Sequence, residues 1–253
     1  MTLSIIIPAH NEGETLEANV EGFLSSLPAA ARSTVIEIII VENGSKDATL
    51  AVSQKLADRH RGLVRCLSLA RGSYGEAIKA GMMAAIGSHL TILECDFLDV
   101  NFVCSSITTV QQNAAPFIVA SKRHSQSTDR RPLKRRIFTL LFNLILNVTT
   151  GYPGKDTHGL KCIESGLAKR LCQSSITTDE VFQTEIVLLA WRWGVPIKEV
   201  PVVIEEIRAS PVSVRRRLPM VLRLVSDLRR SLARFPRLDL KLSKLNSGNV
   251  IAR

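Results

Sequence analysis

Aromatic residues are scarce in this chain of 253 residues, since Phe, Trp and Tyr together make up 5% of it. None of them alternates with the basic residues, although a surface that stacks on single-stranded nucleic acid needs this arrangement. Cysteine is sparse too, and the five cysteines are scattered and form no CxxC pair. These absences predict no nucleic-acid partner, no disulfide framework and no zinc site, and they favour a reducing compartment.

Long apolar runs are missing as well. No stretch reaches the roughly 18 apolar residues that a membrane-spanning helix needs. Met1 leads directly into a strand-like segment, without the charged and apolar regions of a secretory leader. We therefore expect a cytoplasmic protein. The composition, with 45% hydrophobic and 22% charged residues, is that of a folded chain long enough to bury a large core.

The net charge of +10 is unevenly distributed. Residues 122–136 carry a net charge of +6 and residues 205–253 one of +8, whereas the remainder of the chain carries −4. Two basic segments on a slightly acidic body predict a local anionic partner, such as a membrane surface or phosphate groups.

Short apolar runs alternate with helical patterns over the first 120 residues. Several runs, such as residues 5–7 and 38–41, are continuous, which is typical of strands buried on both faces of a parallel sheet. The expected strands cover 3–8, 35–41, 63–69, 90–94 and 116–121, with helices near 13–27, 47–61, 73–87 and 101–112. This order predicts an α/β fold with a mostly parallel central sheet flanked by helices.

Polar and acidic residues follow four of the expected strands. They form the segments 8–12 (PAHNE), 42–47 (ENGSKD), 70–75 (ARGSYG) and 94–96 (ECD). Each segment alone is typical of a turn or a helix N-cap, and Asp47 is a good cap candidate. Ligands of open α/β sheets bind beyond the carboxyl ends of the strands. The four segments together therefore predict a polar cleft that can take a metal ion.

These segments resemble a known family. The stretches 4–16 (SIIIPAHNEGETL), 37–49 (EIIIVENGSKDAT) and 70–96 (ARGSYGEAIKAGMMAAIGSHLTILECD) are similar to the N-terminal half of the family-2 inverting glycosyltransferases. The stretches 119–125, 132–147, 155–162 and 194–210 are similar to the branch of dolichyl- and polyprenyl-phosphate mannose and glucose synthases. The resemblance covers about residues 3–215 and implies a GT-A fold that binds a nucleoside diphosphate sugar.

The resemblance also implies a divalent ion, Mg²⁺ or Mn²⁺, to stabilise the charge that develops on the leaving diphosphate. Glu94 and Asp96 stand at the family's metal-binding Asp-x-Asp, so Asp96 is the expected direct ligand and Glu94 assists it directly or through water. Glu94 is one methylene longer than the usual Asp, and Leu98 stands where relatives often carry Gln. An ordinary pair of solvent-facing acids at a strand end is the alternative.

Further residues are implied around the nucleotide sugar. The expected binding residues are Pro8, His10, Glu12, Glu42, Cys95, Lys122 and Arg215, and the expected catalytic residues are Glu94, Asp96 and Arg208. Glu42 replaces the usual Asp and can accept hydrogen bonds from ribose hydroxyls. His10 stands where relatives have Tyr, and it either stacks on the base or is an ordinary loop residue. Lys122 replaces an Arg and can attract the diphosphate only as a point charge.

The nature of the acceptor depends on whether a general base is present. A sugar hydroxyl has to lose its proton as it attacks, which normally needs a positioned carboxylate, whereas a lipid phosphate is already anionic. Several polyprenyl-phosphate relatives carry an Asp two residues before a Glu that matches Glu185, and Gln183 stands in that place here. Asp179 or Glu180 could still reach a hydroxyl. The pattern favours phosphate as the acceptor.

Two basic amphipathic segments predict peripheral attachment to a membrane. Residues 130–136 are basic and precede an apolar run at 137–146, which is too short to span a bilayer but can lie in its interface. Residues 215–235 place apolar residues on one side of a helix and arginines mostly on the other. Either helix can instead pack on the domain with a solvated basic face. The residues expected on the acceptor side are Arg131, Lys134, Arg135 and Asp156.

These patterns divide the chain into a glycosyltransferase domain at 1–210, a basic interfacial helix at 211–235 and a flexible tail at 236–253. The leading hypothesis is an inverting, metal-dependent hexosyltransferase. It would move a sugar from a donor of the GDP-mannose or UDP-glucose type to a polyprenyl phosphate at the cytoplasmic membrane face. Two alternatives remain open. One is a soluble transferase acting on a carbohydrate hydroxyl, and the other is a catalytically weak relative that binds nucleotide sugar or an assembly partner. The expected attachment is to a membrane surface or to a membrane partner protein.

Overall fold

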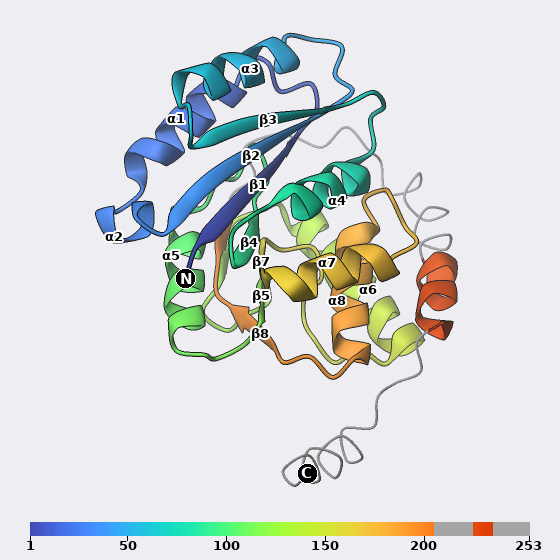
Figure 1. Ribbon diagram of the computed structural model, residues 1–253. Helices are drawn as coiled ribbons and strands as arrows, with labels where there is room; N and C mark the ends of the chain where they lie inside the picture. The colour runs from blue at the N-terminus through green and yellow to red at the C-terminus, as the bar shows by residue number, and fades with distance from the viewer. Residues whose placement is uncertain (205–224, 235–253) are drawn as a thin grey trace, which may run out of the picture.

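A seven-stranded sheet runs through the centre of the molecule (Figure 1). The computed structural model describes residues 1–204 and 225–234. The strands of the sheet, in the order β3-β2-β1-β4-β7-β5-β8, are β1 (Leu3–Ala9), β2 (Val35–Asn43), β3 (Val64–Leu69), β4 (His89–Ile92), β5 (Phe117–Ala120), β7 (Lys161–Glu164) and β8 (Ile197–Val200). A second, two-stranded sheet joins β6 (Thr128–Asp129) to β9 (Val203–Ile204).

Helices connect most of the strands and cover both faces of the sheet. They are α1 (Leu16–Ser26), α2 (Ala29–Arg32), α3 (Thr49–Arg59), α4 (Tyr74–Ala84), α5 (Val100–Gln111), α6 (Leu133–Thr150), α7 (Ser165–Ser174) and α8 (Phe182–Arg192). Residues 225–233 form a further helical segment. No helix within the described residues is long and apolar enough to cross a membrane.

The parallel sheet predicted from the continuous apolar runs is confirmed for β1 to β4. In β1, Ile5, Ile6 and Ile7 pair with Ile38, Ile39 and Ile40 of β2 in parallel register, and β4 pairs with the other side of β1. All of these isoleucines are fully buried, because both faces of the sheet are covered. The exception to the parallel arrangement is β7, which runs antiparallel between β4 and β5.

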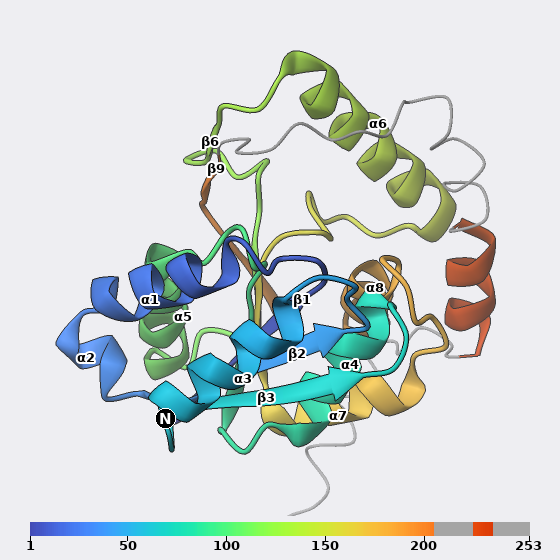
Figure 2. The same cartoon turned by 90° about the horizontal axis from the view of Figure 1, so that it is seen from above.

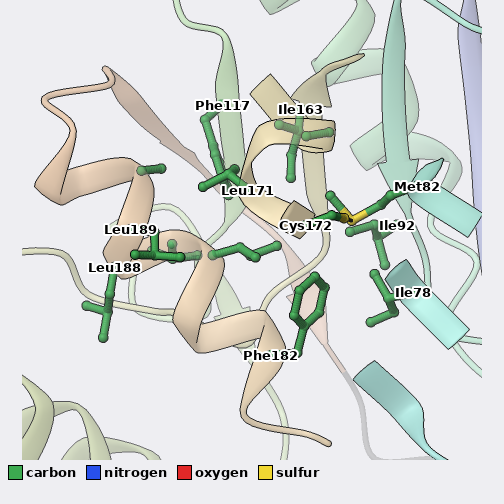
Figure 3. Close-up of a cluster of buried hydrophobic side chains, with 14 of the residues drawn as sticks. Ile78, Met82, Ile92, Phe117, Ile163, Leu171, Cys172, Phe182, Leu188 and Leu189 are labelled. Atoms are coloured by element: carbon green, nitrogen blue, oxygen red, sulfur yellow. Dashed lines mark hydrogen bonds between the residues drawn. The ribbon is translucent and has the colours of Figure 1, made fainter. Parts of the chain in front are cut away.

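Two apolar cores lie on opposite faces of the sheet. Helices α1, α3 and α5 cover the face that carries Ile5 and Ile7. Helices α4, α7 and α8 cover the face that carries Ile6 and Ile39, and Figure 3 shows their side chains meeting around Phe182. Every residue of α8 from Phe182 to Ala190 is buried. The polar side chains of this helix therefore lie inside the protein, where they need partners.

The direction of the strands brings distant segments to one edge of the sheet. β1, β2, β3 and β4 all end there, and the antiparallel β7 begins there, since Lys161 pairs with Ile92. This edge therefore collects the residues after four parallel strands and the first residue of β7.

The expected elements of the first 120 residues are all present, with ends that differ from the expected ones by a few residues. The predicted domain at 1–210 is described up to residue 204, and the basic helix expected at 211–235 only between residues 225 and 234. The tail expected at 236–253 lies outside the described residues. The division into these three parts stays a prediction.

Candidate functional site

The loops after β1 and β2 form one wall of the site. The Nδ1 of His10 donates to the carbonyl of Asn43 over 2.7 Å, because a carbonyl can only accept. The other ring nitrogen then accepts from the side-chain amide of Asn11 at 3.0 Å. The ring of His10 also lies against Gly72, where an added Cβ would be 3.2 Å from it. His10 is thus held by its neighbours although its surface is exposed.

Glu42 is buried at the end of β2. One of its carboxyl oxygens accepts from the backbone amide of Ser45 and the other from the hydroxyl of Ser68, each over 2.6 Å. Burial opposes the charge of Glu42, but these hydrogen bonds outweigh it and lower the pKa of the carboxyl group. The side chain of Glu42, one methylene longer than the usual Asp, therefore holds the loop between β2 and α3 through the backbone amide of Ser45.

Two other predicted binding residues lie in the same wall. Pro8 is buried within β1, and Glu12 is half-buried in the loop that follows. The backbone amide of Glu12 donates to the hydroxyl of Thr49 over 2.8 Å. Asp47 was expected to cap α3; the helix begins one residue later, after Ala48, and Asp47 accepts from the amides of Gly13 and Thr49. These bonds join the first loop to the start of α3.

A hydrogen-bonded chain of four polar side chains lies in the middle of the site. The Nζ of Lys161 donates to the Oε1 of Gln183, and the Nε2 of Gln183 donates to the Oε1 of Glu94 over 3.0 Å. The hydroxyl of Tyr74 also donates to this Oε1. The four residues come from α4, the end of β4, the start of β7 and the start of α8. The fold thus brings four distant segments to one carboxyl group.

Burial sets the charges in this chain of side chains. It raises the pKa of Glu94, against the hydrogen bonds from Tyr74 and Gln183 and the charge of Lys161. It lowers the pKa of Lys161 to about 7, against the attraction of Asp156 and Glu94. Lys161 is fully buried and its Nζ also donates to the carbonyl of Gly159 over 2.7 Å. An ionisable group so strongly perturbed at the edge of a sheet is typical of a functional site.

Asp96 lies two residues beyond Glu94 and is exposed. Within residues 1–204 and 225–234, no hydrogen bond or ion pair engages its carboxylate. Between the two acids, Cys95 is buried and its carbonyl accepts from the side chain of Asn19 over 2.9 Å. This bond fixes the backbone that carries both acids.

The two acids fit a hard divalent ion. No group of three or more His, Cys, Asp or Glu side chains that could hold a metal occurs among the described residues. Mg²⁺ and Mn²⁺ do not require one, because they are commonly held by one or two carboxylates together with substrate phosphates and water. Asp96 offers both carboxylate oxygens, and Glu94 offers its Oε2, which accepts no hydrogen bond from the described part of the chain.

A second charged group lies beside this centre. Asp156 is buried and accepts from the backbone amides of Lys122 and His158 over 3.1 and 3.0 Å. Its Oδ2 also lies 4.0 Å from the Nζ of Lys122. Burial opposes the charge of Asp156, but Lys122 and the amides outweigh it and lower its pKa. The pair leaves Lys122 at the edge of the sheet with 14% of its side chain exposed.

The loop between α7 and α8 closes over the start of α4. The carbonyl of Thr178 accepts from the hydroxyl of Ser73 and from the amide of Glu76, the latter over 3.0 Å. The approach is close, because a Cβ at Gly75 would lie 2.5 Å from the carbonyl carbon of Thr178. Asp179 and Glu180 follow in this loop and are exposed.

Glu185 lies away from solvent, one turn inside α8. It is fully buried, and its oxygens accept from the amides of Ile176 and Thr177, each over 2.9 Å. They also accept from the hydroxyls of Thr177 and Ser231. All of these donors are protein groups, so Glu185 holds the loop and the segment 225–233 together.

The residues expected on the acceptor side are only partly brought together. Asp156 lies beside Lys122, as described above. Arg131 instead forms a two-pronged ion pair with Asp129, at 2.9 and 2.7 Å. Lys134 is exposed and Arg135 half-buried in the first turn of α6. The predicted Arg208 and Arg215 lie outside the described residues.

Sequence reasoning missed Tyr74 and Lys161 as members of the site. Tyr74 stands in the segment 70–75 that was singled out, but nothing in that segment marks its hydroxyl as a partner of Glu94. Lys161 is a lysine on a buried strand between Leu160 and Cys162. A charged residue in an apolar strand was the available signal, because a lysine is almost never fully buried without partners.

The mostly parallel α/β sheet, with polar residues beyond the ends of its strands, is of the GT-A type that the sequence resemblance implies. The family model for "Glycosyl transferase family 2" matches residues 4–164, and this chain belongs to that family.

Relatives at about 25% identity share most of the chain. A dolichyl-phosphate beta-glucosyltransferase of Dictyostelium discoideum is 27% identical over 221 residues, which cover 82% of this chain and 68% of the relative. The protein of the same description from Homo sapiens is 25% identical, with the same coverage of both chains.

The fold is also that of solved structures. Glucosyl-3-phosphoglycerate synthase from Mycobacterium tuberculosis in complex with UDP has a TM-score of 0.66 and 17% identity, and the match covers 92% of this chain and 80% of that one. The complex of this synthase with Mn²⁺, UDP and phosphoglyceric acid has a TM-score of 0.67 and 18% identity, with 94% and 80% covered. Both comparisons confirm the predicted fold class.

Proposed function

We propose that the protein transfers glucose from UDP-glucose to a polyprenyl phosphate, with inversion, at the cytoplasmic face of a membrane. The observation that carries this proposal is the composition of the acceptor region. Gln183 is an uncharged amide bound to Lys161 and Glu94, and Glu185 is fully buried and occupied by protein donors. Neither side chain can take a proton from a hydroxyl acceptor, whereas a phosphate acceptor needs no base.

The choice of sugar and nucleotide rests on the relatives. Relatives from Dictyostelium discoideum, Drosophila melanogaster and Homo sapiens are dolichyl-phosphate beta-glucosyltransferases. The solved synthase of the same fold was crystallised in complex with UDP. These names favour UDP-glucose over a donor of the GDP-mannose type.

In the proposed reaction an oxygen of the acceptor phosphate attacks the anomeric carbon from the face opposite the diphosphate. The bond between that carbon and the diphosphate oxygen breaks, and UDP leaves with the electron pair. A divalent ion bound through Asp96 and Glu94 would supply the positive charge that stabilises the leaving group. The synthase of the same fold was crystallised with Mn²⁺ and with Mg²⁺. Lys122, oriented by Asp156, adds a cation at the same edge of the sheet.

Helix α6 supports attachment to a membrane. Seven of its apolar residues are exposed on one face: Leu133, Ile137, Leu140, Leu141, Leu144, Ile145 and Val148. We call this set the α6 stripe. Figure 2 shows α6 at one side of the molecule, away from α1, α2 and α3. A helix with an exposed apolar stripe and cations at its start suits the interface between lipid headgroups and acyl chains. Phe142 belongs to the apolar run 137–146 that is expected to lie in the membrane interface, but it is buried against the core.

Transfer of label from radiolabelled UDP-glucose into an organic-solvent extract tests the proposal. The purified protein should form a labelled lipid when a short-chain polyprenyl phosphate and Mn²⁺ or Mg²⁺ are present, and the anomeric configuration of the product should be β. GDP-mannose in the same assay should be a poor donor. Release of free glucose without any lipid product, or transfer from GDP-mannose alone, would contradict the proposal.

A further inference from the structure

Gln183 has an orientation that its neighbours dictate. Its amide lies between the ammonium of Lys161 and the carboxyl group of Glu94. Lysine has only donors, so the amide oxygen has to face Lys161. The amide NH₂ then has to face Glu94, to whose Oε1 it donates over 3.0 Å. Only 4% of Gln183 is exposed, so water does not compete for these bonds.

As a result, the two carboxyl oxygens of Glu94 differ in the hydrogen bonds that they accept. Its Oε1 accepts from both Tyr74 and Gln183, whereas its Oε2 accepts from none of the groups in the described residues. Two donors on one oxygen fix the plane of the carboxyl group and leave the other oxygen for a ligand outside the protein. The partly buried carboxyl group of Glu94 needs such donors, because burial otherwise favours its neutral form.

Glu94 and Gln183 are also matched to one another. A carboxylate at position 183 would oppose the carboxyl group of Glu94 with like charge, and an apolar side chain there would remove one hydrogen-bond partner from each of Lys161 and Glu94. The amide satisfies both neighbours at once, since it presents an acceptor to the cation and a donor to the acid. The long side chain of Glu94 is what reaches this donor from the end of β4.

We propose that Gln183, held by Lys161, is a positioning residue that turns the free oxygen of Glu94 toward the metal–diphosphate. This inference rests on the proposed function, because it assumes that a metal-bound nucleoside diphosphate occupies the site. It assigns to Gln183 a role in metal-dependent binding of the donor and none in binding of the nucleotide itself. The groups that hold a metal ligand in place typically affect metal affinity by about 10- to 100-fold.

The test measures the affinity of the full chain for UDP by calorimetry, with Mn²⁺ and with chelator. Gln183→Met keeps the length of the side chain but removes its hydrogen bonds to Lys161, Glu94 and Tyr74. It should weaken Mn²⁺-dependent binding of UDP by at least about tenfold and change the binding without metal less than about twofold. Gln173→Met is the matched control, because Gln173 is exposed on α7. It should leave both affinities unchanged.

A second variant keeps the inference testable if Gln183→Met does not fold. The double variant Glu94→Gln, Gln183→Glu exchanges the acid and the amide. The amide at position 94 can then donate to the carboxylate at position 183, and this carboxylate can accept from Lys161. The double variant should melt within a few degrees of the wild type and still lose Mn²⁺-dependent binding of UDP, because the carboxylate has moved away from Asp96.

Three results would overturn the inference. In the first, Gln183→Met and the wild type show the same Mn²⁺-dependent affinity for UDP. This result leaves the proposed function intact. The second is an exchanged variant that folds and binds as the wild type does, which also leaves that function intact. The third is a wild type that binds UDP neither with nor without Mn²⁺, which overturns the proposed function as well.

Discussion

Single residues at this site are defined by their burial and their hydrogen-bond partners more than by residue type. Glu42 and Glu94 are both acids at the ends of strands, yet hydrogen bonds lower the pKa of the first and burial raises that of the second. Asp96 stands beside Glu94 in sequence and is open to solvent. The same kind of side chain therefore shapes a loop, accepts hydrogen bonds from two donors or faces solvent, according to where the fold places it.

The buried Lys161 predicts how stability depends on pH. Its pKa is about 7 in the folded protein and near 10.5 in the unfolded chain. Between these values the unfolded state binds more protons, so the free energy of unfolding should rise with pH. From pH 7 to 9 the rise should amount to about 2 kcal/mol.

Urea denaturation at pH 7, 8 and 9 checks this expectation. Lys161→Met removes the titrating group, so its stability should change less over this range whatever its absolute value. An equal rise in both proteins would show that another group is responsible.

Asp96→Asn is the simplest test of the metal site. The exposed side chain keeps its size but loses its charge, so the melting temperature should stay within about 2 °C, because surface substitutions change stability by less than about 0.5 kcal/mol. Transfer of sugar and Mn²⁺-dependent binding of UDP should both fall by more than about tenfold, since the proposed metal ligand is lost. Full transfer in the presence of a chelator would refute a role for Glu94 and Asp96 in metal binding.

At the scale of elements, α8 links the site to the last described segment. Glu185 of this helix accepts hydrogen bonds from Ile176 and Thr177 of the preceding loop and from Ser231 of the segment 225–233. The same loop contacts the start of α4 through Thr178. The helix, the loop and the C-terminal segment therefore form one hydrogen-bonded unit, with Leu228 and Leu232 packed into the core beside it.

Loss of the hydrogen bonds to Glu185 should lower the stability of the protein strongly. Glu185→Ala leaves several buried donors without a partner and should lower the free energy of unfolding by about 3 kcal/mol or more. Ser231→Ala removes one of these hydrogen bonds and should cost about 1–2 kcal/mol. Ser226→Ala is the matched control, since Ser226 is exposed in the same segment and should matter little. Chemical denaturation measures the free energy of unfolding of all three variants. An equal loss of stability in Ser231→Ala and Ser226→Ala would contradict a stabilising role of the hydrogen bond between Ser231 and Glu185.

The elements also show what could be predicted from the sequence. Continuous isoleucine runs predicted β1 and β2 correctly, because burial on both faces leaves a clear pattern. The antiparallel β7 was not predicted, since it is short and begins with a buried lysine that breaks the apolar pattern. The acids after β4 were predicted to lie at the site, but their partners Tyr74, Lys161 and Gln183 come from three distant segments. These contacts depend on the tertiary fold, and the local signal was limited to Lys161, a charged residue in an apolar strand.

At the scale of the whole molecule, α6 combines exposed apolar residues with the basic residues 130–136 at its start. The α6 stripe and the basic residues that precede it lie at one side of the described structure. Because residues 122–136 carry a net charge of +6, an anionic membrane should attract the side of the protein on which α6 lies.

Co-sedimentation with liposomes tests this arrangement. The protein should bind vesicles that contain acidic lipid, and the binding should weaken as salt rises, because each basic residue near the surface contributes roughly 1 kcal/mol within a Debye length of about 8 Å. A part of the binding should resist salt, and the combined variant Leu141→Ser, Leu144→Ser, Val148→Ser should remove it. Ile86→Ser, at an exposed apolar residue outside α6, is the control. Equal binding to neutral and acidic vesicles would exclude the electrostatic contribution.

In the proposed reaction the acceptor is already an anion when it attacks. The most direct measurement compares the initial rates of glucose transfer from UDP-glucose to a short-chain polyprenyl phosphate and to the polyprenol of the same length, with an alkyl glucoside as a hydroxyl acceptor. We predict transfer to the phosphate and none above background to either alcohol, because neither Gln183 nor Glu185 can act as a general base. Transfer to the polyprenol or the glucoside at a rate comparable to that of the phosphate would contradict the account.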